Sequence, residues 1–198
     1  MGIITSGAFI LASKSPRRIE LLNLMGIKHL EVIPSKVKET FLSGENPDAH
    51  VRRLSKEKAE TLACLYPKAW VLGADTIVVI DGEILGKPHN PSEAGEMLRK
   101  LSGREHRVFT GFTVINNSLN ILIGDCVEST VLFRNLGEDE IQWYIDTPEP
   151  HDKAGGYAVQ GIGAFFIKEI HGSYTNVMGL PLCEVVDVLK KSGAIRFS

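Results

Sequence analysis

Residues 69–80, AWVLGADTIVVI, form a nearly continuous apolar run that only Asp75 and Thr76 interrupt. Its β-branched residues predict a buried β-strand. Asp81-Gly82 follows directly, which predicts a tight turn into a short return strand over Glu83–Leu85. We therefore expect a fold built on a sheet that contains this strand.

Strand and helix patterns alternate around this run, and strand patterns cluster later in the chain. This order predicts an α/β or α+β domain with a mixed sheet. The chain contains no linker that would divide it, so we expect a single domain over residues 1–198. Further strands are predicted at 9–12, 29–34, 107–115, 120–133 and 164–170, and helices at 16–25, 48–65, 91–102, 138–145 and 182–191.

Composition excludes several classes of protein. The net charge of −2 gives no reason to expect a broad nucleic-acid or membrane patch. No apolar stretch is long enough to span a bilayer, and the N-terminal residues lack the basic start of a signal peptide. The three cysteines are far apart and odd in number, which is typical of a reduced cytoplasmic protein.

The segment SKSPRR, residues 13–18, starts the first predicted helix with two cations. Ser15 suits an N-cap and Pro16 the first helical position. Arg17 and Arg18 then lie where the helix dipole is positive, which disfavours each cation by roughly 0.3–1 kcal/mol. A bound anion would explain this placement, and a capped helix with solvated arginines is the alternative.

Asp75 is the least expected residue of its segment. A buried carboxylate costs free energy unless it is paired or binds a metal. Gly73 and Ala74 before it leave space for another group to approach. A functional carboxylate and a structural one satisfied by backbone or arginine are both compatible with this pattern.

Other candidate residues are weaker when each is taken alone. Lys87 lies between a glycine and a proline, and Lys153 and Gln160 belong to the glycine-rich stretch DKAGGYAVQGIG. Glu39 follows a predicted strand, and Lys58 lies on the long predicted helix. Each of these side chains alone also fits a solvated surface.

Taken together, these residues predict chemistry on a polyphosphate. The carboxylates of Glu39 and Asp75 provide oxygen ligands for a divalent cation. Attack of water on phosphorus depends mainly on positioning and on stabilisation of charge, and cations supply that stabilisation. The candidate cations are Arg17, Arg18, Lys58, Lys87 and Lys153.

Seven sequence motifs resemble those of one protein family, the Maf family of nucleoside triphosphate pyrophosphatases, and together they span nearly the whole chain. In order, they are LASKSPRR, VKET, LSKEKA, GADTIVVIDGEILGKP, MLRKLSGREHRVFTG, DKAGGYAVQG and NVMGLPL. Several motifs in family order are far more specific than any single one.

The resemblance implies hydrolysis between the α- and β-phosphates of a nucleoside triphosphate, which releases a nucleoside monophosphate and pyrophosphate. It implies Mg²⁺ or Mn²⁺ as cofactor, a house-cleaning role in nucleotide metabolism, and a homodimer. It also implies a two-lobed domain around a long twisted mixed sheet with a deep cleft, similar to inosine triphosphate pyrophosphatases.

The motifs carry residue roles over to this chain. Asp75 matches the family's catalytic residue, as general base or metal ligand, and Glu39 matches the second metal-binding carboxylate. Five positions match residues that bind phosphate in the family: Ser13, Arg17, Arg18, Lys58 and Lys87. Lys153 is expected to take part in phosphate and substrate binding with them.

Two branches of the family differ in substrate. SPRR, GADT and KAGxYxxQG are typical of the branch acting on dTTP and UTP, whereas SPWR and GSDQ are typical of the branch acting on 7-methyl-GTP. Arg17, Thr76, Lys153 and Gln160 make this chain resemble the first branch. A Gln amide can both donate and accept, as a uracil or thymine edge requires, so Gln160 is the candidate for base recognition.

Two departures and two alternatives stand beside this interpretation. Gly156 replaces the usual alanine of KAGAY, and Lys38 stands beside Glu39 where an acidic residue is common. A regulatory, cell-division-related protein that binds nucleotides without turnover is one alternative. A pyrophosphatase of the 7-methyl-GTP or purine type is the other.

Overall fold

The computed structural model describes residues 3–27 and 29–197. The chain forms two compact units, each described by itself below. Unit 1 comprises Met1–Asp75, Thr110–Val127 and Gly179–Ser198, and unit 2 comprises Thr76–Phe109 and Glu128–Met178.

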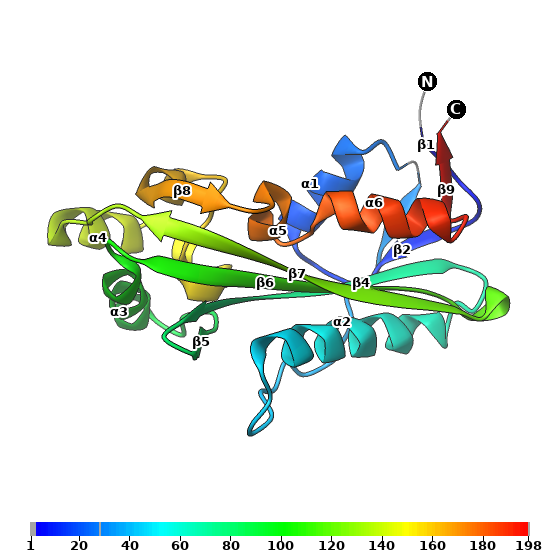
Figure 1. The fold of residues 1–198 in the computed structure, drawn as a ribbon, viewed down its shortest axis with the longest axis horizontal. Helices are drawn as coiled ribbons and strands as arrows, with labels where there is room; N and C mark the ends of the chain where they lie inside the picture. The colour runs from blue at the N-terminus through cyan, green and yellow to red at the C-terminus, as the bar shows by residue number, and fades with distance from the viewer. Residues whose placement is uncertain (1–2, 28, 198) are drawn as a thin grey trace. The chain divides into compact units, whose positions relative to one another are not determined.

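The described residues form a mixed sheet of seven strands and a separate pair of strands (Figure 1). The large sheet has the order β3-β2-β4-β6-β7-β8, with β5 paired to β4. Strand β2 is parallel to β3 and β4, whereas β5 and β8 are antiparallel to their partners. The predicted mixed α/β class is therefore confirmed. The strands are β1 (Ile3–Thr5), β2 (Phe9–Leu11), β3 (Leu30–Val32), β4 (Trp70–Ile80), β5 (Glu83–Leu85), β6 (Glu105–Asn116), β7 (Ile121–Phe133), β8 (Ile167–His171) and β9 (Ile195–Phe197).

Three of the helices begin with the Pro that the sequence places after a cap residue. The side chains of Asn46 and Asn90 each accept a hydrogen bond from the backbone N–H three residues later, which caps the helix. Ala49 N donates to Asn46 at 2.8 Å, and Glu93 N donates to Asn90 at 2.9 Å. Ser15 occupies the cap position of α1 without such a side-chain bond. The helices are α1 (Pro16–Leu24), α2 (Pro47–Ala63), α3 (Pro91–Leu101), α4 (Glu138–Ile145), α5 (Tyr174–Met178) and α6 (Leu182–Lys191).

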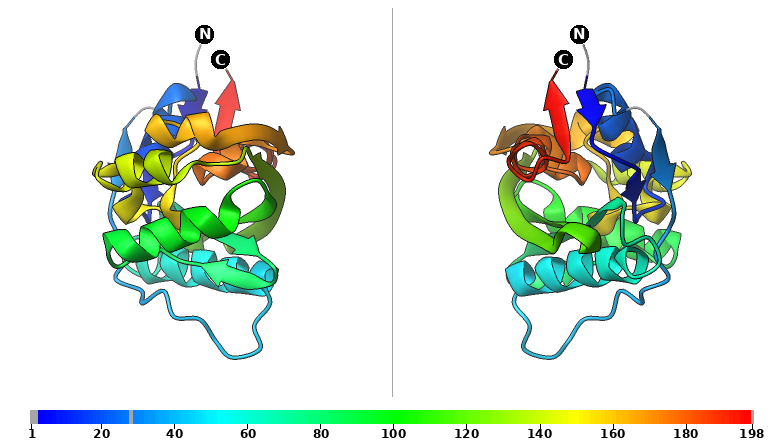
Figure 2. Two further views of the ribbon diagram at one scale, coloured as in Figure 1. Left: turned by 90° about the vertical axis from the view of Figure 1, so that its left-hand side faces the viewer. Right: turned by 90° about the vertical axis from the view of Figure 1, so that its right-hand side faces the viewer.

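In unit 1, α2 covers one face of the strands, and α1 and α6 lie on the other (Figures 1 and 2). A buried cluster joins α2 to the sheet; its members are Ile10, Ala12, Ala59, Leu62, Ala63, Ala69, Val71 and Ile115. Two glycines, in strands β4 and β6, allow α2 to lie close to the sheet. A Cβ built on Gly73 would meet the Ser55 carbonyl oxygen at 2.2 Å, and one on Gly111 the Val51 carbonyl oxygen at 2.3 Å.

The ends of the described chain meet in unit 1. Strands β1 and β9 pair antiparallel, with Ile3 opposite Phe197, and Figure 2 shows the two strands side by side. Within the described residues, no helix has the length and apolar character needed to cross a membrane.

Unit 2 has an aromatic core between the sheet and helices α3 and α4. Phe133 packs edge-on against His106 and Tyr157, and Tyr144 against Phe166. Burial lowers the pKa of His106 to about 4, so the ring is neutral near pH 7. The remaining core is aliphatic and includes Val78, Ile80, Leu85, Leu98, Leu101, Val108, Val131 and Ile141.

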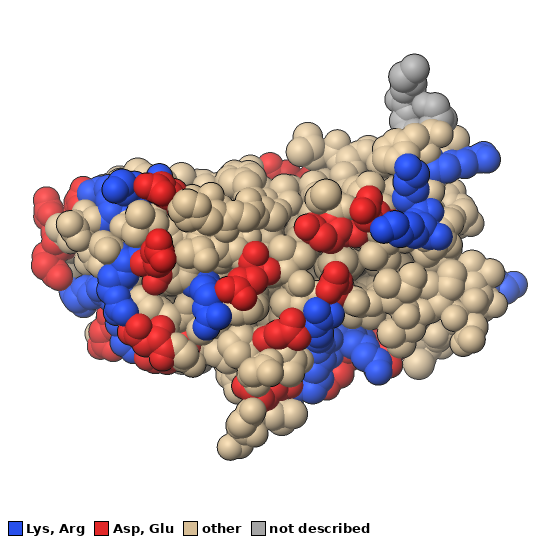
Figure 3. Space-filling model, viewed as in Figure 1, with Lys and Arg blue, Asp and Glu red and all other residues tan. Residues whose placement is uncertain are grey.

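Charged side chains of opposite sign lie beside one another on the face drawn in Figure 3. The ion pairs of unit 2 agree with this picture: Arg99 contacts Glu138 at 2.8 Å, and Arg104 contacts Asp81 at 2.6 Å. Such exposed pairs contribute little to stability, because water screens both charges.

The predicted elements are found, with differences at their ends. Strand β3 covers only Leu30–Val32 of the predicted 29–34. The predicted strand 164–170 is wrong in its first part, because residues Ile162–Phe166 form a 3₁₀ turn before β8. That turn follows Gly161, whose φ of 132° interrupts an extended course. Strands β1 and β9 and helix α5 were not expected from periodicity.

We expect Gly73→Ala to lower the free energy of unfolding by about 1–3 kcal/mol, because the added methyl group would push α2 away from β4. Urea unfolding followed by circular dichroism measures this change. Gly7→Ala is the control, since its Cβ would come no closer than 4.0 Å, to the Lys68 carbonyl oxygen. Equal stability of both variants would show that the close approach is unnecessary.

Candidate active site

Arg18 is buried at the start of α1 and is held by three acceptors in unit 1. Its Nε donates to the Gly179 carbonyl oxygen at 2.8 Å. Its Nη1 donates to Ser13 Oγ at 3.0 Å and to the Ala74 carbonyl oxygen at 2.8 Å. Burial lowers the pKa of its guanidinium, and the charge of Asp75 opposes that shift. The guanidinium thus connects α1 to the residue that precedes Asp75.

Arg17 differs from its neighbour, because its side chain is half-buried whereas Arg18 is buried. The first turn of α1 contains no acidic residue that would offset the two cations. Ser15 N donates to Ser13 Oγ at 3.2 Å, so the Ser13 hydroxyl joins the turn before α1 to Arg18. The turn therefore concentrates positive charge at the positive end of the helix dipole.

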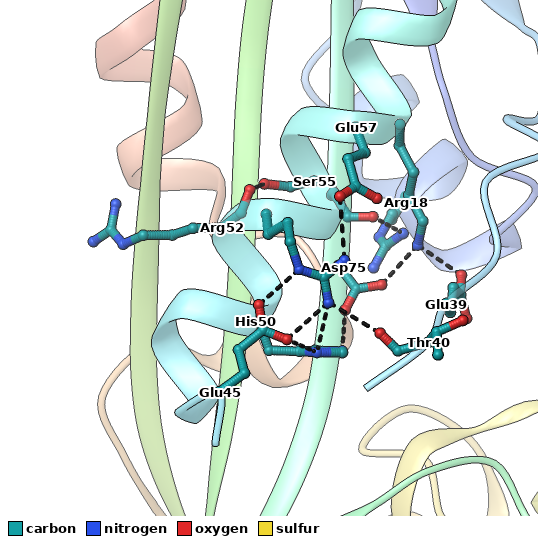
Figure 4. A network of polar contacts seen from close by, with 12 residues as sticks. Arg18, Glu39, Thr40, Glu45, His50, Arg52, Ser55, Glu57 and Asp75 are labelled. Atoms are coloured by element: carbon teal, nitrogen blue, oxygen red, sulfur yellow. Dashed lines mark hydrogen bonds and ion pairs between the residues drawn. The ribbon is translucent and has the colours of Figure 1, made fainter. Parts of the chain in front are cut away.

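Asp75 lies in β4, where the surrounding strand is buried, and its side chain is 7% exposed. Lys58, from the buried face of α2, donates to Asp75 Oδ1 at 2.6 Å. The same ammonium donates to Glu39 Oε1 at 2.6 Å. One buried cation therefore holds both predicted carboxylates, and Figure 4 shows Glu39 and Asp75 in the same network.

His50, on the first turn of α2, lies on the other side of the Asp75 carboxylate. Its Nε2 is 4.0 Å from Asp75 Oδ2, and its Nδ1 is 2.9 Å from Glu45 Oε2. The ring of Phe41 stacks on the imidazole with 4.3 Å between the ring centroids. His50 is 1% exposed, so these contacts orient a buried ring toward Asp75.

Arg53 fastens the loop that carries Glu39 to α2. Its Nε and Nη2 donate to Glu45 at 2.7 Å each, and Nη2 donates to the Thr40 carbonyl oxygen at 3.0 Å. The hydrogen bonds from Arg53 lower the pKa of Glu45 to about 2. Glu45 is thus ionised near neutral pH, and the residue after Glu39 is held in place.

The described residues contain no group of three or more His, Cys, Asp or Glu side chains that could hold a metal ion. Two carboxylates nevertheless converge on one cation, since Glu39 and Asp75 both accept from Lys58. Magnesium is commonly bound by one or two carboxylates together with substrate phosphates. The donor set therefore fits a metal that arrives with a polyphosphate.

The structure brings together some of the predicted site residues. Glu39, Lys58 and Asp75 form one hydrogen-bonded network, and Ser13 and Arg18 form a second that reaches Ala74. Arg17 stands at the start of α1 in unit 1, and the remaining predicted residues belong to unit 2. Of these, Thr76 is half-buried and Lys87 and Gln160 are exposed. Lys153 donates to the Glu149 carbonyl oxygen.

Sequence reasoning missed His50, Glu45 and Arg53. A signal for His50 was available: it stands with Leu54, Lys58 and Leu62 at four-residue spacing, which places both polar residues on the apolar face of the helix. Glu45 and Arg53 gave no such signal, because charges near a helix start usually lie on a solvated face.

Comparisons with known proteins agree with the predicted family. A family model described as Maf-like protein matches residues 8–192. A dTTP/UTP pyrophosphatase of Syntrophus aciditrophicus (strain SB) is 61% identical over 96% of this chain and 92% of its own length. A dTTP/UTP pyrophosphatase of Geotalea uraniireducens (strain Rf4) is 52% identical over 94% of this chain and 96% of its own length.

Among solved structures, the chain is similar to the Staphylococcus aureus Ham1 protein, with a TM-score of 0.53 and 12% identity. The match covers 94% of this chain and 100% of that one. At this identity the similarity concerns the fold, and it agrees with the mixed α/β class.

We expect Arg18→Met to lower the free energy of unfolding by roughly 2–4 kcal/mol, because two buried carbonyl oxygens and Ser13 would lose a charged donor. Urea unfolding measures the change. Arg17→Met is the matched control, and we expect it to alter stability by less than about 0.5 kcal/mol. A small effect of both substitutions would contradict the anchoring role of Arg18.

Proposed function

The chain belongs to the Maf family, and on this basis we propose that it hydrolyses dTTP and UTP between the α- and β-phosphates. The products are the nucleoside monophosphate and pyrophosphate. The observation that carries this proposal is the buried Lys58 ammonium, which holds Asp75 and Glu39 at 2.6 Å each. The names of relatives at 61% and 52% identity support the substrate class.

Asp75 acts in this proposal as the general base. As the water oxygen forms its bond to phosphorus, a proton passes to the Asp75 carboxylate, and the leaving pyrophosphate takes the electron pair of the broken P–O bond. Lys58 holds Asp75 on Oδ1, and His50 faces Oδ2, so the carboxylate is oriented before substrate binds. Such preorganisation is a major source of catalysis at charged centres.

Glu39 and Asp75 would hold the divalent cation, Mg²⁺ or Mn²⁺, together with phosphate oxygens of the substrate. When bound, the cation neutralises charge that develops on the phosphates. Lys58, which already contacts both carboxylates, keeps them close to one another. Arg53 contributes by fixing the residue after Glu39.

Phosphate binding in this proposal uses the start of α1 and cations of unit 2. Ser13 and Arg17 contribute from the turn before α1 and its first residues. Arg18 holds that turn through its hydrogen bond to Ser13 and adds a second positive charge there. Lys87 and Lys153 contribute from unit 2. The deep cleft that the family resemblance implies belongs to this proposal.

Substrate choice rests in this proposal on Arg17, Thr76 and Gln160. Gln160 is an exposed residue, and a Gln amide can both donate to and accept from a uracil or thymine edge. We also propose that the chain acts as one domain over residues 1–198, as a homodimer. It would work in the cytoplasm, which its three free cysteines support.

We expect Asp75→Asn to reduce pyrophosphate release from dTTP by at least about 100-fold, because the amide cannot accept the proton. A coupled pyrophosphate assay with Mg²⁺ or Mn²⁺ measures this. Asp81→Asn is the matched control, since that carboxylate lies in the turn after the same strand and is 68% exposed. Full activity of Asp75→Asn would refute the assigned base.

Calorimetry on the unmodified chain separates catalysis from sensing. Tight binding of dTTP with no release of pyrophosphate would contradict the proposed hydrolysis and favour the nucleotide-binding regulator.

We expect Arg17→Trp to lower turnover of dTTP and UTP and to shift preference away from them, because this position differs between the two branches. The assay is a panel of dTTP, UTP, CTP, 5-methyl-UTP and 7-methyl-GTP. Arg196→Trp on β9 is the control for adding an exposed indole. An equal loss on all five nucleotides would contradict a selective role for Arg17.

A further inference from the structure

The side chain of Glu149 organises the glycine-rich segment of unit 2. Glu149 lies in a 3₁₀ turn, Glu149–Asp152, that follows α4. Its Oε1 accepts from the Tyr144 hydroxyl at 2.9 Å and from Gly163 N at 2.7 Å. Its Oε2 accepts from Ile162 N at 2.8 Å. One carboxylate therefore satisfies two consecutive backbone N–H groups directly after Gln160-Gly161.

The turn that begins at Gly161 is shaped around this carboxylate. A Cβ at Gly161 would lie 2.4 Å from Glu149 Oε2, and the φ of 132° is one that side chains rarely adopt. A Cβ at Gly163 would lie 2.8 Å from the Tyr144 hydroxyl. Both glycines thus allow the backbone to approach the carboxylate and its tyrosine partner.

The backbone of Glu149 reaches the other end of the same segment. Lys153 Nζ donates to the Glu149 carbonyl oxygen at 2.8 Å and also contacts Asp152. The Lys153 side chain is 12% exposed. Glu149 therefore contacts Lys153 through its carbonyl oxygen and, through its carboxylate, the two residues that follow Gln160-Gly161.

We propose that Glu149 is a positioning residue for substrate selection: its carboxylate holds the turn after Gln160 in the conformation that presents the amide to the base. This inference rests on the proposed function, because it takes the pyrimidine edge as the partner of Gln160. A carboxylate that receives three donors restrains the turn more strongly than a single hydrogen bond.

Three substitutions grade this restraint. Glu149→Gln keeps the shape but places an NH₂ group opposite one of the donors, so at least one hydrogen bond is lost. Tyr144→Phe removes one donor and leaves the two backbone bonds. Glu138→Gln is the matched control, since this residue begins α4 and its side chain is 69% exposed.

The measurement is the ratio of dissociation constants for α,β-imido-dUTP and α,β-imido-dCTP, obtained by calorimetry with Mg²⁺. We expect Glu149→Gln to reduce this discrimination roughly tenfold. Tyr144→Phe should reduce it less, and Glu138→Gln should leave it unchanged. Hydrogen exchange at the Ile162 and Gly163 amides should become faster in Glu149→Gln.

The outcomes separate this inference from the proposed function. If Glu149→Gln lowers only thermal stability and keeps the discrimination ratio, the positioning role is wrong. Failure of the unmodified chain to release pyrophosphate would refute the proposed hydrolysis. The binding ratio would still decide the role of Glu149, because the imido analogues are not hydrolysed.

Discussion

The contact between Lys58 and the buried Asp75 is the interaction on which the candidate site depends. A carboxylate inside an apolar strand would be strongly destabilising without a partner. Lys58 reaches it because α2 lies directly on β4, where Gly73 has no side chain to separate them. The same ammonium also holds Glu39, so one cation determines how far apart the two carboxylates lie.

The two arginines at the start of α1 have different environments. The cost of placing Arg18 at the positive end of the helix is offset by the carbonyl oxygens of Ala74 and Gly179 and by Ser13. The position of Arg18, which the helix dipole disfavours, is therefore explained by acceptors within the chain. Arg17 is half-buried, and its position remains the stronger reason to expect an anion at this turn.

Much of the fold could be predicted because its signals are local. The apolar run of β4, the start of α3 at Pro91 and the turn at Asp81-Gly82 were all recognisable, whereas the start of α2 was placed one residue late, at Asp48. Strands β1 and β9 were missed, because these short strands pair with each other from opposite ends of the chain, and no local signal specifies that pairing. The turns around Gly161 were missed because the carboxylate that shapes them comes from Glu149, earlier in the chain.

The sequence by itself determined the types of the longer helices and strands, the family and the presence of an unusual carboxylate at position 75, because each depends on residue identity and short-range order. The tertiary structure decided which cation faces that carboxylate. Lys58 is 17 residues from Asp75, and the Gly179 acceptor is 161 residues from Arg18. Such pairs follow from how helices pack on the sheet, which local propensity does not specify.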